Sequence, residues 1–166
     1  TVVKIETENG AKTMGKPQGI YITMEAPNLS VPDEDYHREI SRELARHMKK
    51  LLPEKGELKA LVVGLGNREI TPDSLGPDVI SNLHITRHLI QEYGTLGMGE
   101  TCVHSVSGLV PGVMAQTGME TMEIIRGVVE ETKPDVVIAI DALAARSVKR
   151  LNRTIQLTDT GIQPGS

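Results

Sequence analysis

Two short apolar segments, each followed by turn residues and an aspartate, constrain what this chain can fold into. The first, Val-Val-Gly-Leu-Gly-Asn at 62–67, continues through Thr71 and Pro72 to Asp73. The second, Val-Val-Ile-Ala-Ile at 136–140, leads directly into Asp141. Short apolar runs rich in β-branched residues are typical of strands buried in a parallel sheet. Because loops at the carboxyl ends of such strands line the ligand crevice, both aspartates are predicted at one edge of the sheet.

Extended and helical patterns alternate along the rest of the chain. They predict strands at 2–5, 19–25, 59–65, 101–107, 136–140 and 154–157, and helices at 33–52, 76–91, 118–132 and 142–151. This alternation predicts an α/β fold, a three-layer sandwich with a mostly parallel sheet and helices on both faces. No repeat or linker divides the 166 residues, so residues 1–166 are predicted to form a single α/β domain.

Composition excludes several classes of protein. The net charge of −4 argues against a nucleic-acid-binding protein, which normally presents a basic face. No apolar run reaches the ~18 residues of a membrane span, and no signal peptide opens the chain. Cys102 is the only cysteine, so no intrachain disulfide forms, which fits a reducing, cytoplasmic compartment.

Asp73 and Asp141 are the candidate catalytic residues. If they lie close together, burial and like-charge repulsion raise the pKa of one carboxyl group. One carboxylate then activates water while the other protonates the carbonyl oxygen or the leaving amine, which is hydrolysis without a metal or a covalent intermediate. The alternative for Asp73 is structural: Thr71 caps a helix and Asp73 faces its dipole.

The Gly-Leu-Gly-Asn turn at 64–67 also suggests a phosphate- or nucleotide-binding loop. The dinucleotide fingerprint requires a third glycine and a helix that begins at once, whereas Glu69 and a polar loop follow here. A tight turn that lets the loop double back over the strand end is the preferred interpretation.

Three further patterns are candidates for a metal site, a nucleophile and a contact for an acidic substrate. His84 and His88 are four residues apart on the predicted 76–91 helix, a spacing that can share a metal, but the Glu of a His-Glu-x-x-His motif is missing. Cys102 lies in a predicted strand, where a buried structural role is favoured over a nucleophile. A basic cluster follows Asp141 and is either a solvated helix face or a contact for an acidic substrate: Arg146, Lys149, Arg150 and Arg153.

A series of distinctive motifs follows along the chain, and their joint occurrence in this order is more specific than any one of them. They are Gly-Leu-Gly-Asn at 64–67, Thr-Pro-Asp-Ser-Leu-Gly-Pro at 71–77, Thr-Arg-His-Leu at 86–89, Pro-Gly-Val-Met at 111–114, Thr-Gly-Met-Glu-Thr at 117–121, Lys-Pro-Asp at 133–135, Ala-Ile-Asp-Ala-Leu-Ala-Ala-Arg at 139–146 and Thr-Asp-Thr-Gly-Ile-Gln-Pro-Gly-Ser at 158–166. In this combination the chain closely resembles the germination protease of endospore-forming bacteria.

The resemblance implies an atypical aspartic endopeptidase that degrades small acid-soluble spore proteins during germination, in the cytoplasm of the forespore or spore core. It implies a zymogen and a homotetramer, with no cofactor and no metal. The family's two proposed catalytic aspartates match Asp73 and Asp141. Asn67 and Asp159 are the candidate substrate-binding residues. We also expect that this chain is part of a longer protein, with a propeptide and a C-terminal part outside it.

A second family with a similar predicted fold is the hydrogenase-maturation endopeptidases, which use nickel to recognise their substrate. They share the Gly-x-Gly-Asn turn followed by an acidic loop and a helix, and their metal-binding carboxylate falls at about the position of Asp73. In that case His88 or His104 is the histidine to test. A non-enzymatic phosphate- or nucleotide-binding module remains the third hypothesis.

Overall fold

The computed structural model of this protein describes residues 1–94, 103–143 and 151–162. The chain divides into two compact units. The first contains residues 1–52 together with described residues from 143 onward, and the second contains residues 53–94 and 103–142. The single domain expected from the sequence stays a prediction.

The first unit is built on an antiparallel sheet with the order β1-β2-β6. Its strands are β1 (Val2–Ile5), β2 (Gly19–Glu25) and β6 (Thr154–Thr158), and β2 pairs with both neighbours. Its buried side chains include Ile5, Ile22 and Met24. All three strands were predicted, but β6 was expected to belong to a largely parallel sheet.

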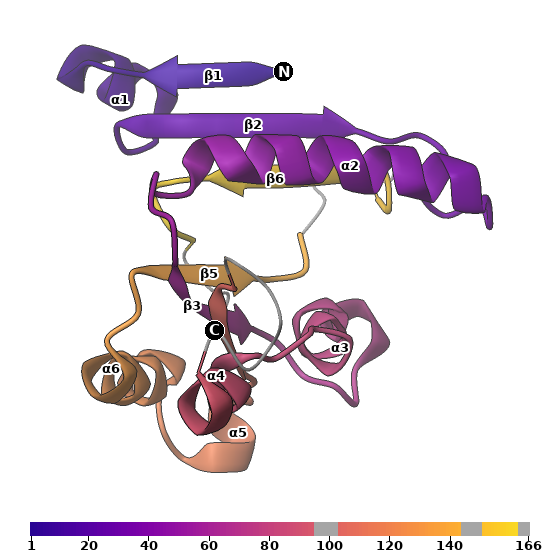
Figure 1. Ribbon diagram of the computed structural model, residues 1–166. Coiled ribbons are helices and arrows are strands. Elements are labelled where there is room, and N and C mark those ends of the chain that lie inside the picture. The colour runs from indigo at the N-terminus through magenta and orange to yellow at the C-terminus, as the bar shows by residue number, and fades with distance from the viewer. Residues whose placement is uncertain (95–102, 144–150, 163–166) are drawn as a thin grey trace. The chain divides into compact units, whose positions relative to one another are not determined.

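Two helices belong to this unit (Figure 1). Helix α2 (Glu34–Leu51) contacts β6 and begins where predicted, because the Asp33 side chain accepts a hydrogen bond from the Tyr36 N–H at 3.0 Å. Helix α1 (Glu8–Met14) was not among the predicted helices. It is a single short helix capped by Thr7 and ended by Gly15 in the left-handed conformation, and its few residues carry no readable periodicity.

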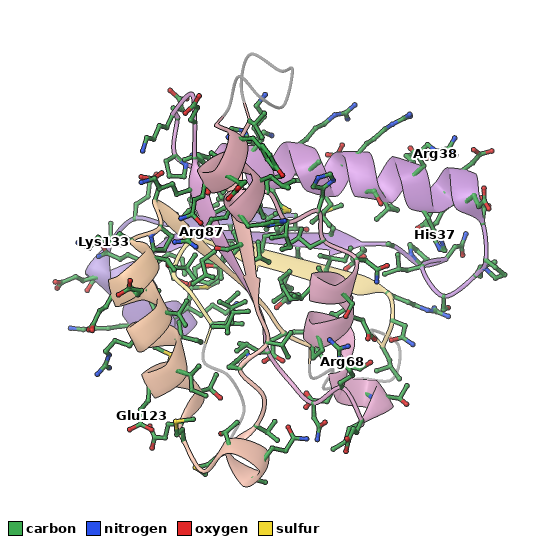
Figure 2. The ribbon with its side chains drawn as sticks, turned by 60° about the horizontal axis from the view of Figure 1, so that its bottom comes forward. His37, Arg38, Arg68, Arg87, Glu123 and Lys133 are labelled. Atoms are coloured by element: carbon green, nitrogen blue, oxygen red, sulfur yellow. The ribbon has the colours of Figure 1, made fainter. Side chains whose placement is uncertain are left out.

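The second unit is built on a parallel sheet with the order β4-β3-β5. Its strands are β3 (Lys59–Gly64), β4 (Ser105–Leu109) and β5 (Val136–Ile140), and β3 pairs in parallel with both neighbours. Figure 2 shows the two ends of this sheet: Arg87 and Lys133 lie toward the amino ends of the strands, and Arg68 and Glu123 lie toward the carboxyl ends.

The two faces of β3 contact different helices. On one face Leu61, Val63 and Leu65 form a buried cluster against which apolar side chains of α6 (Thr121–Thr132) pack. Alternate residues of a strand point to opposite faces, so Gly64 belongs to the other face. There it meets α3 (Leu75–Ser81), and Ile80 of that helix also reaches Gly108 on β4.

The helix predicted at 76–91 is wrong: the structure has α3 and a second helix, α4 (Arg87–Tyr93), separated by residues 82–86. The break is stabilised by Thr86, which is buried beside β4. Its N–H donates to the Val106 carbonyl at 3.0 Å, and its hydroxyl accepts the Val106 N–H at 2.9 Å. A tertiary contact thus replaces the hydrogen bonds that would have continued the helix.

The helix predicted at 118–132 likewise begins later, as α6, after a separate short helix α5 (Met114–Thr117). Gly118 ends α5 at a φ of 71°, and the Glu123 carboxylate accepts the Glu120 N–H at 2.8 Å to start α6. Strand β4 begins at Ser105, and residues 101 and 102 of the predicted strand lie outside the described residues.

Strand β5 is present where predicted, but the prediction that it is fully buried is wrong. Its residues alternate between half-buried and exposed, and Val137 is 41% exposed. The strand lies at the edge of the β4-β3-β5 sheet, and within the described residues only one of its sides has a neighbouring strand. An apolar sequence therefore does not distinguish a central strand from an uncovered edge strand.

At the amino ends of β3 and β5, Asp135 connects the two strands. Its carboxylate accepts hydrogen bonds from Lys55 Nζ at 2.7 Å and from the Lys59 N–H at 2.8 Å. The Lys55 hydrogen bond is the largest cause that lowers the pKa of the Asp135 carboxyl below its usual value, and the Lys59 N–H lowers it further.

Because the pKa of Asp135 is lowered in the folded state, its contribution to stability is present above the unfolded-state pKa of ~3.9 and is lost as the pH falls through the folded value. We therefore expect Asp135→Asn to lower the melting temperature at neutral pH and to have little effect below pH ~3. Thermal unfolding of both proteins at the two pH values checks this. An equal destabilisation at both would contradict the electrostatic account.

Candidate functional site

The site begins where β3 and β5 end side by side. Gly64 and Ile140 are register partners, and the Leu65 N–H extends the ladder by donating to the Ile140 carbonyl at 2.8 Å. Asp141 is the next residue after Ile140, so its position is fixed by the end of the sheet. This confirms that the loop after β3 and Asp141 leave the same edge of a parallel sheet.

The loop after β3 doubles back and holds Asp73. The Asn67 N–H donates to the Asp73 side chain at 2.8 Å and is 3.1 Å from the Asp73 carbonyl oxygen. Gly66 has a φ of 111°, and a Cβ atom there would overlap the Asp73 carbonyl oxygen. Only glycine suits this position, which confirms the tight turn predicted at 64–67.

A contact between two glycines brings this loop onto the strand ends. A Cβ atom on Gly76 would overlap backbone atoms of Leu65 and come within 2.7 Å of the Ile140 carbonyl oxygen. A Cβ atom on Gly64 would overlap the Gly76 carbonyl group. The first turn of α3 therefore lies directly against the ends of β3 and β5. Since Asp73 precedes Gly76 by three residues and Asp141 follows Ile140, the contact brings the two aspartates into one neighbourhood.

The electrostatics of Asp141 reflect this arrangement. Its carboxyl group is half-buried, and burial is the main cause that raises its pKa above the usual value. The Ala142 N–H, which donates to Asp141 Oδ1 at 2.8 Å, opposes the shift, and the negative charge of Asp73 adds to it. A raised pKa beside a second carboxylate is a property that a general acid needs.

The Thr71 cap in the structural alternative for Asp73 is not what the structure has. Residues 71–73 form a single turn of 3-10 helix that Ile70 precedes, and no Thr71 side-chain cap is present. Helix α3 begins after Ser74, whose hydroxyl donates to Asp78 Oδ2 at 2.8 Å. The Asp73 carboxylate instead accepts the Asn67 N–H. That same bond occupies the N–H that a phosphate would need in a glycine-turn binding loop.

The structure distinguishes the two residues predicted to bind substrate. Asn67 lies beside Asp73, and its side-chain oxygen accepts the Glu69 N–H at 2.9 Å. Asp159 lies in the first unit, just after β6, where its Oδ1 accepts the Ile20 N–H at 2.7 Å. Asp159 thus has a structural partner of its own, and its part in substrate binding stays a prediction.

The histidines do not form the pair that their spacing suggested. His84 lies in the segment between α3 and α4, whereas His88 is in the first turn of α4. His104 Nδ1 accepts the Leu58 N–H at 3.2 Å. Within residues 1–94, 103–143 and 151–162, no three His, Cys, Asp or Glu side chains are grouped so that they could hold a metal ion.

Several predicted features fall outside the described residues, namely Cys102, Arg146, Lys149, Arg150 and most of the helix predicted at 142–151. None of the helices that the structure describes is long and apolar enough to cross a membrane. Sequence reasoning missed the role of Gly76. The available signal was a Gly-Pro pair in the first turn of a predicted helix, where glycine is unfavourable unless close packing requires it.

Gly76→Ala tests the close contact. The new Cβ atom would meet backbone rather than flexible side chains, so we expect the free energy of unfolding to fall by ~2 kcal/mol or more. Gly127→Ala is the matched control, because Gly127 lies in α6 with no atom near its Cβ position. There we expect a gain of ~0.5–1 kcal/mol. Denaturant unfolding of both variants measures the difference, and equal effects would refute the contact.

Comparison with known proteins shows which family the chain resembles. The model of one protein family, described as germination protease, matches residues 1–166. The germination protease of Caldanaerobacter subterraneus subsp. tengcongensis is 52% identical over 166 residues, which are 100% of this chain and 51% of the relative. That of Clostridium tetani is 48% identical with the same coverage, and that of Bacillus cereus is 46% identical over 170 residues, covering 100% of this chain and 46% of the relative. The chain spans about half the length of these curated relatives.

Proposed function

Because this chain belongs to the germination protease family, we propose that it carries the catalytic aspartates of an endopeptidase that hydrolyses small acid-soluble spore proteins during germination. The family match along all 166 residues supports the activity. The contact of Gly76 with the ends of β3 and β5, which brings Asp73 to Asp141, is the observation that carries the assignment of the site.

In the proposed mechanism Asp141 holds the proton and Asp73 is ionised. Asp73 removes a proton from water while the water oxygen attacks the peptide carbonyl carbon, and Asp141 gives its proton to the carbonyl oxygen. The tetrahedral intermediate then breaks its C–N bond, the amine nitrogen takes the proton from Asp73, and the hydroxyl proton returns to Asp141. The pair therefore ends each cycle as it began.

The surroundings of each carboxyl group support these roles. Burial and the charge of Asp73 both favour the protonated form of Asp141. The Asn67 N–H points at Asp73 Oδ2, so this oxygen is held in place while the other remains available for water. The Asn67 amide nitrogen beside it is proposed to donate to the substrate backbone.

We propose further that the active protein is a homotetramer made as a zymogen and located in the forespore or spore core. These properties come from the family resemblance. The peptide substrate is proposed to bind at the edge of the sheet that carries both aspartates. Asp73 and Asp141 are half-buried there, so both remain accessible to it.

The catalytic roles predict large losses of activity. The test uses a full-length chimera, in which these 166 residues replace the matched region of the Caldanaerobacter germination protease. In this chimera we expect Asp73→Asn and Asp141→Asn each to lower kcat on a small acid-soluble spore protein by ~10²–10⁴-fold. Asp78→Asn is the matched control, since Asp78 is an exposed carboxylate on the same segment, and it should keep its activity.

Each assay is repeated with EDTA. Activity that survives EDTA and is lost in both variants supports the aspartate pair. Loss with EDTA that nickel restores would move the assignment to a metal-dependent endopeptidase of the hydrogenase-maturation type. Full activity in both variants would place the site elsewhere. Stabilisation by nucleotides together with indifference to Asp141→Asn would favour the binding-module hypothesis.

The raised pKa of Asp141 also predicts a pH-dependent effect on stability. The folded state binds the Asp141 proton more tightly than the unfolded state, so ionisation above the unfolded pKa of ~3.9 costs stability as the pH rises through the folded value. Asp141→Asn removes this cost. We therefore expect the variant to melt at a higher temperature than the wild type at neutral pH, with the difference shrinking below pH ~3. A lower melting temperature at neutral pH would contradict this.

A further inference from the structure

The two edge strands of the β4-β3-β5 sheet differ in how their outer backbone groups are satisfied. In a parallel pair, alternate residues direct both their N–H and C=O groups toward the same neighbour. The Ser105 N–H donates to the Leu58 carbonyl at 2.8 Å, so Ser105 faces β3 and Val106 faces outward. Thr86 takes up both outward groups of Val106, as described above. The outer edge of β4 is therefore closed at Val106, near the start of the strand.

Among the residues that the structure describes, the outer edge of β5 has no such partner. The Ile140 carbonyl accepts the Leu65 N–H, so Ile140 faces β3, and by alternation Val136 and Ile138 do too. Val137 and Ala139 then direct their N–H and C=O groups outward. No residue in the described parts of the chain forms a hydrogen bond with these groups.

The side chains of β5 are also uncovered on one face. Val137 and Ala139 are exposed, whereas their register partners on β3, Leu61 and Val63, are 1% and 0% exposed beneath α6. The apolar face of the sheet therefore extends from β3, which α6 covers, onto β5, whose side chains on that face are exposed.

The sequence of β5 is unsuited to a permanent edge. Exposed edges are normally protected by a charged side chain, a proline or a bulge, because unpaired apolar strands aggregate. The run Val-Val-Ile-Ala-Ile contains neither a charge nor a proline, and its register with β3 is unbroken over all five residues. These are the properties of a strand that has neighbours on both sides.

We propose that the outer edge of β5 pairs with a strand from the part of the germination protease polypeptide that lies outside the region matched here. The curated relatives match this chain along its whole length and are about twice as long. They therefore contain enough additional polypeptide to supply both a strand for the edge and apolar side chains for the face at Val137. Because Asp141 follows β5 directly, the added strand runs beside the aspartate pair and helps to enclose it.

Amide hydrogen exchange tests this pairing. In the 166-residue chain alone, the amides of Val137 and Ala139 should exchange at least ~10-fold faster than those of Ile138 and Ile140, which donate toward β3. In the full-length chimera all four should be protected. The aligned amides of the full-length Caldanaerobacter relative give a second measurement that does not depend on how well the chimera folds.

Each other outcome overturns the proposal. Rapid exchange of Val137 and Ala139 in both longer proteins means that no strand pairs with this edge. Protection in the 166-residue chain that increases with concentration means that a second copy occupies it. Protection at all concentrations means that the edge is already closed within this chain.

A pair of proline substitutions gives an independent test. Ala139→Pro removes an outward N–H, which an unpaired edge tolerates, so it should leave the melting temperature of the 166-residue chain nearly unchanged and lower that of the chimera. Val106→Pro is the matched control, because Thr86 uses the outward N–H of Val106, and it should lower the melting temperature in both proteins. If Ala139→Pro has no effect on the chimera, the proposal is wrong.

Discussion

The close contact between Gly64 at the end of β3 and Gly76 in the first turn of α3 is the constraint on which the site depends. Without a side chain at either position, the helix backbone lies against the strand ends. Any side chain there would separate the two elements by the thickness of a methyl group or more, and interiors packed at close to crystal density have little room to adjust. The position of Asp73 relative to the sheet follows from this contact.

The two proposed catalytic groups are held by different means. Asp141 is placed by the strand ladder, through its neighbour Ile140 and the hydrogen bond from Leu65. Asp73 is placed by the loop, through Asn67 and the glycine turn. Both depend on backbone hydrogen bonds rather than on long side chains, which gives the carboxyl groups little freedom. Such preorganisation matters for acid–base chemistry, because proton transfer requires hydrogen-bond distances.

The sheet that carries the site is asymmetric. One edge is closed by Thr86, whose contact with Val106 also interrupts the helix expected at 76–91. The other edge ends at Asp141, where Val137 is exposed and where the described part of the chain supplies no partner for the outward backbone groups of β5. The uninterrupted apolar sequence that makes β5 resemble a central strand is also the reason for our proposal that a further strand pairs with it. The proposed strand and the proposed activity both concern the edge of the sheet at which Asp141 lies.

Sequence alone was sufficient for the parallel strands at β3 and β5, for α2 with its Asp33 cap and for the tight turn at Gly66, because these depend on apolar periodicity and local turn chemistry. It also placed Asp73 and Asp141 at one edge of the sheet, and their catalytic role stays a proposal. Tertiary structure decided the break at Thr86, the strand order, the placing of β6 in an antiparallel sheet and the fit of Gly76 against Leu65. These depend on contacts between residues far apart in the chain, and no local pattern records which distant backbone atom a glycine or a threonine will meet.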